Sequence, residues 1–156
     1  MIAGARYAHT NLIARDWRSL ARFYERVFGC VPVPPERDYA GAELEALTSI
    51  PGASLAGVHL RLPGAGDDGP TLEIFEYRSG MPESAPSVDR PGFAHVAFAV
   101  SSVREAVDEV VAAGGSAVGE IVSFTLATGT EVTAAYVRDP EGNVIELQSW
   151  SGSGDK

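Results

Sequence analysis

The chain has 156 residues, a single cysteine and a formal net charge of −9. This length fits one domain, or one domain built from two small halves. The negative charge argues against a nucleic-acid or anionic-membrane partner, because neutralising phosphates requires lysine and arginine. The lone Cys30 excludes an internal disulfide and is expected to be a small buried residue. No apolar run approaches the ~20 residues of a membrane span, and no basic-then-apolar leader opens the chain, so we expect a cytoplasmic protein.

The first half begins with the pattern of a strand followed by a helix. Weak alternation over residues 5–13 indicates the strand. Asp16 is suited to cap a helix over residues 17–28, where large apolar residues recur at helical spacing. Gly29 follows the last of these residues and is expected to end the helix.

Further strands are expected in the rest of this half. Residues 31–35 are rich in proline, which excludes a central strand because proline cannot donate a ladder hydrogen bond. Residues 37–47 are ambiguous. Clearer alternation predicts strands over residues 55–62 and 71–77.

The second half repeats this order. Alternation predicts a strand over residues 93–100, and Ser101 or Ser102 is expected to cap a helix that ends at Gly114-Gly115. Three more strands are predicted, near residues 117–125, 131–138 and 144–150. The last of them follows a tight turn that contains Pro140 and Gly142.

The order strand, helix, three strands therefore occurs twice, and this internal repeat predicts the fold. We predict an α+β protein with a single domain over residues 1–150. It consists of two βαβββ modules, over residues 5–78 and 92–150, and a proline-rich linker over residues 79–91 joins them. Residues 151–156 are expected to form a disordered tail.

Four polar residues occupy equivalent places in the two halves. His9 and His95 lie on the first strand of each half, and Glu73 and Glu146 on the last. Taken singly, a strand histidine is more often a core residue and a strand glutamate more often faces solvent. Equivalent inward residues of two symmetric halves converge on the pseudo-two-fold axis, where two imidazoles and two carboxylates would form a divalent metal site.

Six residues share strand faces with these four and are expected to line a pocket or support the ligands. Plain packing explains them equally well. They are Tyr7, Asn11, Phe75, Tyr77, Gln148 and Trp150. His59 is a further candidate for a pocket wall, although an exposed or core histidine is the commoner case. Glu76 falls on the face opposite Glu73 and is not expected to be a ligand.

Five segments carry a resemblance to a known family, and together they cover nearly the whole chain. They are residues 8–12 (AHTNL), 16–29, 71–74 (TLEI), 92–98 (GFAHVAF) and 139–147 (DPEGNVIEL). They resemble the vicinal oxygen chelate superfamily, the glyoxalase, bleomycin-resistance and extradiol-dioxygenase group, and the last segment is the most specific. The resemblance implies curved mixed sheets around a metal, pairing of chains into a homodimer, and the ligand set His9, Glu73, His95 and Glu146.

The complete ligand set resembles that of glyoxalase I or methylmalonyl-CoA epimerase, so a lyase or isomerase is expected. Ile13 stands where glyoxalase I places an arginine for glutathione, which argues against that cofactor. We expect one divalent metal (Ni, Co, Zn, Mn, Mg or Fe(II)) to stabilise an enediolate or enolate of a small carbonyl or thioester substrate. Glu146 and Glu73 are the expected acid–base residues. The alternatives are an extradiol-type dioxygenase and a non-catalytic drug- or metabolite-binding resistance protein.

Overall fold

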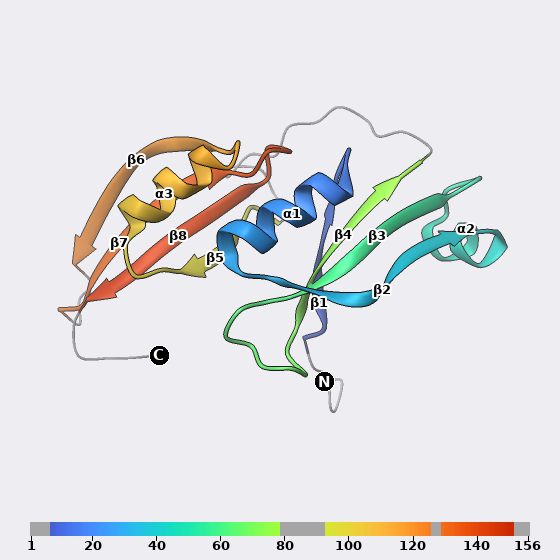
Figure 1. Cartoon of the computed structure of the whole chain (residues 1–156), viewed down its shortest axis with the longest axis horizontal. Coiled ribbons are helices and arrows are strands. Elements are labelled where there is room, and N and C mark those ends of the chain that lie inside the picture. Colours follow the sequence, from blue (N-terminus) through green and yellow to red (C-terminus); the bar gives the residue numbers. More distant parts are fainter. Residues whose placement is uncertain (1–6, 79–92, 126–128, 152–156) are drawn as a thin grey trace. The chain divides into compact units, whose positions relative to one another are not determined.

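The computed structural model describes residues 7–78, 93–125 and 129–151. The chain divides into two compact units, Met1–Glu83 and Ser84–Lys156. Each unit holds one four-stranded sheet with a helix across one face (Figure 1). The expected linker over residues 79–91 and the tail from residue 152 onward lie outside the described residues.

The first unit has the predicted order of elements with one extra helix. Its elements are β1 (His9–Ile13), α1 (Trp17–Phe28), β2 (Val31–Ala40), α2 (Ala42–Thr48), β3 (Ser54–Arg61) and β4 (Thr71–Tyr77). The strands lie in the order β1-β4-β3-β2; β1 is parallel to β4, and the other neighbours are antiparallel. The proline-rich β2 lies at the edge, as predicted, because an edge strand tolerates missing N–H donors. Helix α2 falls in the ambiguous stretch and buries none of its residues.

The second unit has the same topology. Its elements are β5 (Val96–Ala99), α3 (Val103–Ala112), β6 (Ser116–Thr125), β7 (Glu131–Arg138) and β8 (Val144–Ser151). The strands lie in the order β5-β8-β7-β6, with β5 parallel to β8. The α+β fold of two βαβββ modules is therefore confirmed. Two boundaries were wrong: β5 begins only after His95, because its pairing with β8 starts at Val96, and Ser151 pairs with Glu131 instead of belonging to the tail.

Three of the four ends of α1 and α3 have the capping residues that the sequence predicts. Asp16 Oδ1 accepts a hydrogen bond from the Ser19 N–H at 3.0 Å. Gly29 ends α1 with φ 67°, a left-handed conformation that glycine adopts at little cost. Ser102 caps α3, but that helix ends at Ala112 with Ala113 as its C-cap, before the predicted glycines.

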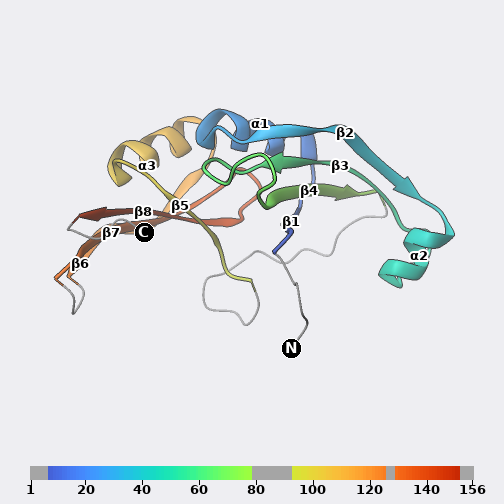
Figure 2. The ribbon, with the colours of Figure 1, turned by 90° about the horizontal axis from the view of Figure 1, so that it is seen from below.

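Each helix packs its apolar stripe against its own sheet. Figure 2 shows the first sheet nearly edge-on, with α1 lying on one side of β3 and β4. The side chains that are almost completely buried include Leu20, Tyr24, Leu60, Leu72 and Ile74 in the first unit, and Val110, Val137, Ile145 and Leu147 in the second. Because successive strand residues point to opposite faces, the residues next to these buried ones face away from the helix. The candidate ligands of both units lie on that face.

Candidate metal site

Three strands of the first unit bring two histidines and a glutamate together. His9 begins β1, His59 lies on β3 and Glu73 lies on β4 between them. In the antiparallel pair β3–β4, His59 stands directly opposite Glu73. In the parallel pair β1–β4, Asn11 is the register partner of Glu73, and His9 shares the face of Asn11. Cross-strand partners share a face, so the polar groups of these three residues meet.

The distances suit a metal centre. His59 Nε2 lies 2.7 Å from Glu73 Oε1, and His9 Nε2 lies 3.6 Å from Glu73 Oε2. One ligand atom from each of the three residues lies within 4.8 Å of the others. A divalent ion about 2.0–2.2 Å from each donor requires donors roughly 3–4 Å apart. The donor set therefore fits a divalent ion after small side-chain shifts.

Two neighbouring residues orient these ligands. Thr71 Oγ1 forms a hydrogen bond with His59 Nδ1 at 2.9 Å, which turns Nε2 of His59 toward Glu73. The Asn11 side-chain amide donates to Glu73 Oε2 at 2.9 Å. Outer partners of this kind fix the tautomer and the orientation of metal ligands.

The charge state of His59 also favours metal binding. Burial lowers the pKa of its imidazole, and the positive charge of Arg37 and a contribution from His9 lower it further, while Glu73 opposes the shift. The neutral imidazole is the form that binds a metal. His59 is therefore prepared as a ligand at neutral pH.

The second unit carries a related but incomplete arrangement. His95 Nε2 lies 3.1 Å from Glu146 Oε2. Tyr136 of β7 stands opposite Glu146, in the register position that His59 holds opposite Glu73. The rings of His95 and Tyr136 lie 5.3 Å apart. The phenol stands where the first unit has its second imidazole, so among the described residues this cluster holds one histidine and one carboxylate.

The structure thus brings the predicted ligands together in two pairs, one within each unit. The pairs are His9 with Glu73 and His95 with Glu146. Convergence of all four on one metal stays a prediction. Sequence reasoning did not place His59 among the candidate ligands. Its strand parity placed it among candidate pocket walls, but only the pairing of β3 with β4 places it opposite Glu73.

The residues predicted to line a pocket in the first unit lie in different surroundings. Asn11 donates a hydrogen bond to Glu73, and the ring of Phe75 lies 6.2 Å from that of His59. Tyr77 is the last residue of β4, on the face of Phe75. Tyr7 precedes β1 and is 67% exposed. Their role as pocket walls stays a prediction.

In the second unit Gln148 and Trp150 share the face of Glu146 on β8. The Trp150 indole N–H donates to Gln148 Oε1 at 3.1 Å. The turn before β8 is held by Asp139, a buried carboxylate that accepts hydrogen bonds from the N–H groups of Glu141 and Asn143, each at 2.9 Å. This turn fixes where β8 starts, and therefore the position of Glu146.

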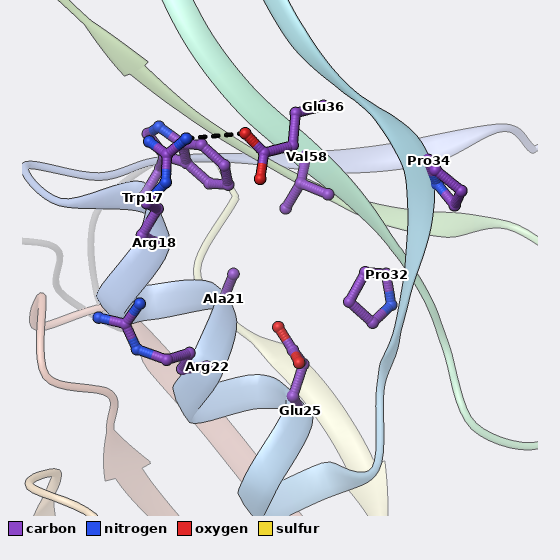
Figure 3. Close-up of a pocket in the computed structure, with 9 residues that line it drawn as sticks. All are labelled: Trp17, Arg18, Ala21, Arg22, Glu25, Pro32, Pro34, Glu36 and Val58. Atoms are coloured by element: carbon purple, nitrogen blue, oxygen red, sulfur yellow. Dashed lines mark hydrogen bonds and ion pairs between the residues drawn. The ribbon is translucent and has the colours of Figure 1, made fainter.

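The opposite face of the first sheet holds a different cavity. A pocket of about 450 Å³ lies between α1, β2 and Val58 of β3 (Figure 3). Arg18 and Glu36 close part of its rim with an ion pair of 2.7 Å. Val58 precedes His59, so the pocket lies on the helix side and is separate from the metal cluster. On this side Glu76 Oε2 accepts the Trp17 N–H, which confirms that Glu76 faces the helix and not the ligands.

Comparison with known proteins establishes the class. The model of the Glyoxalase/Bleomycin resistance protein/Dioxygenase superfamily matches residues 6–147, and the chain belongs to this superfamily. Virulence protein STM3117 of Salmonella typhimurium is 32% identical over 146 residues, which span 93% of this chain and 84% of that protein.

Solved structures share the fold. A glyoxalase family protein from Bacillus cereus superposes with a TM-score of 0.80 at 18% identity, covering 97% of this chain and 100% of that one. The fosfomycin resistance protein FosX of Listeria monocytogenes, complexed with Mn(II) and sulfate, gives a TM-score of 0.52 at 17% identity, covering 96% and 93%. Among the described residues, no helix is long and apolar enough to cross a membrane.

Proposed function

We propose that the protein is a metal-dependent enzyme that moves a proton next to the carbonyl or thioester group of a small substrate, as a lyase or an isomerase. The observation that carries this proposal is the cluster of His9, His59 and Glu73, whose donor atoms lie within 4.8 Å of one another. The Mn(II) bound by FosX supports a divalent ion in a related fold.

His9, His59 and Glu73 would hold the metal, and His95 and Glu146 are the ligands predicted from the second unit. When bound, the metal supplies a positive charge beside the substrate oxygens, which favours the enolate form of a carbonyl compound. The protein must then remove a proton from the neighbouring carbon, and a carboxylate close to that carbon serves as the base.

The two glutamates differ in how firmly they are held. Glu73 accepts hydrogen bonds from Asn11 and His59, and its side chain is 12% exposed. Glu146 is 24% exposed and, among the described residues, pairs with His95. We assign the main proton transfer to Glu146, because its carboxylate has fewer fixed partners and is more exposed to a substrate. The acid–base role predicted for Glu73 would then be to exchange the proton on the opposite face of a substrate that is epimerised.

A second candidate reaction follows from the same cluster. Two histidines and one carboxylate in one unit form the ligand set typical of non-haem Fe(II) oxygenases. An extradiol-type dioxygenase is therefore the alternative. Oxygen consumption with catechols and restored Fe(II) separates it from the isomerase, which consumes no oxygen.

The test begins with the metal content of the purified protein. Each restored metal is then screened with 2-oxo thiohemiacetals, acyl-CoA thioesters and catechols, and deuterium incorporation from solvent reports proton exchange. We expect Glu146→Gln to keep metal and to lose about 10²–10⁴-fold in turnover. The matched control is Glu131→Gln, at an exposed glutamate on β7, and its turnover should match that of the wild type. Normal turnover of Glu146→Gln with full metal would contradict the proton-transfer role.

We also propose that the chain forms a two-fold homodimer, because open sheets leave edge strands that need cover. The proline-rich β2 and strand β6 are edge strands of the two sheets. Sedimentation should give twice the 16.4 kDa chain mass. A species of single-chain mass at micromolar concentration would contradict the dimer.

A further inference from the structure

Two arginines share the face of the first sheet that carries His59. Arg61 lies two residues further along β3, so its side chain leaves the sheet on the same side. Arg37 of β2 stands opposite Gly57, which lies two residues before His59. Cross-strand partners share a face, so Arg37 also lies on this side. The ligand His59 is therefore flanked by a cationic side chain in each direction along β3.

This arrangement is unfavourable for a cation alone. The chain has a net charge of −9, so the overall charge does not explain positive groups at this place. Guanidinium groups on the face of a divalent ion repel it, and an anion bound to a guanidinium reduces that repulsion.

Arg61 is incompletely paired within the protein. Its Nη1 lies 3.3 Å from Asp67 Oδ1, but the Asp67 side chain is 91% exposed, so solvent screens this pair. The Nε donor of Arg61 is buried and has no hydrogen-bond partner. An unpaired buried donor is unfavourable, so a ligand that draws the guanidinium outward removes that cost.

We propose that Arg61 binds an anionic group of the substrate, a carboxylate or a phosphate, while the metal centre holds the carbonyl oxygens. This inference rests on the proposed metal site and specifies the substrate class. The planar guanidinium of arginine matches the two oxygens of such a group. The Cα atoms of His59 and Arg61 are about 6.6 Å apart along the strand. The anionic group is therefore separated from the chelating oxygens by a short carbon chain.

The test uses compounds that differ only in the distal anion. Calorimetric titration of the Mn²⁺-loaded protein compares 2-oxoglutarate with 2-oxobutyrate, which lacks the distal carboxylate. We expect 2-oxoglutarate to bind about 10- to 100-fold more tightly, as a charged hydrogen bond provides. The phosphonate analogue 2-oxo-4-phosphonobutyrate shows which of the two anions is preferred.

The variants assign the preference to Arg61. Arg61→Gln should abolish the preference for 2-oxoglutarate over 2-oxobutyrate. Arg61→Lys should weaken this preference, because lysine keeps the charge but loses the planar guanidinium. Arg104→Gln, at an exposed arginine of α3, is the matched control and should keep the preference. Circular dichroism confirms that each variant is folded. Equal binding of the compounds to the wild type, or a full preference in Arg61→Gln, would overturn the proposal.

Failure of the metal site gives a different result. If the metal centre is wrong, Mn²⁺ does not bind, or His59→Ala binds it as the wild type does. Glutarate is then titrated into the metal-free protein. Binding that Arg61→Gln weakens supports the anion site even without a metal, and binding that is absent or unchanged in Arg61→Gln overturns it.

Discussion

Replacing His59 with alanine is expected to abolish tight metal binding by the first unit. The substitution removes one of three donor atoms that lie within 4.8 Å of one another, and it removes the partner 2.7 Å from Glu73. Loss of an outer-shell partner typically lowers metal affinity about 10- to 100-fold. Loss of a direct ligand should exceed this range, so we expect a decrease of more than about 100-fold, or about 2.7 kcal/mol.

A graded pair of variants distinguishes a ligand from a structural residue. Thr71→Val removes the 2.9 Å hydrogen bond to His59 Nδ1 and keeps the ligand, so metal affinity should fall about 10- to 100-fold. Tyr136→Phe changes the residue that occupies the equivalent register position in the second unit, and it should leave affinity unchanged. Competition with a chromophoric chelator measures each affinity for Zn²⁺ and Mn²⁺, and elemental analysis gives the stoichiometry.

Two outcomes would refute this reasoning. If His59→Ala keeps wild-type affinity, the cluster of the first unit is not the metal centre. If Tyr136→Phe loses as much metal affinity as His59→Ala, the loss does not depend on removing a ligand imidazole. A comparable melting temperature of the metal-free variants would show that the loss is not caused by unfolding.

Three further predictions concern single residues. Asn11→Ala removes the donor to Glu73 Oε2, and chelator competition should show an affinity loss of about 10- to 100-fold, whereas an unchanged value would exclude the orienting role. Asp139→Ala leaves the turn N–H groups unpaired, so urea unfolding should show a loss of about 2–3 kcal/mol, and a loss below about 0.5 kcal/mol would contradict this. Burial, with the nearby charge of Glu25, raises the pKa of Cys30 to about 11, so its thiol should react with iodoacetamide about 100-fold more slowly in the folded protein than in urea. Because the unfolded thiol ionises near its pKa of 9.0 and the folded thiol only near 11, the free energy of unfolding should fall as the pH rises from about 9 to about 11.

The sequence by itself determined the elements whose rules are local. Helix α1 follows from the cap at Asp16, the apolar spacing within the helix and Gly29, all of which are contiguous in the chain. The proline content placed β2 at a sheet edge. The internal repeat identified His9, Glu73, His95 and Glu146 as candidate ligands, because equivalent strands carry them. The structure brings them together as one pair in each unit, and convergence of all four stays a prediction.

Only the tertiary structure decided which third residue completes the cluster. Alternation along β3 fixes the face of His59 but not its neighbour, since the neighbour depends on how β3 and β4 pair across the intervening loop. The same register position holds Tyr136 in the second unit, so the repeat alone does not reveal a metal ligand there. The late start of β5 has the same cause, because a strand begins where its partner offers hydrogen bonds and not where alternation begins.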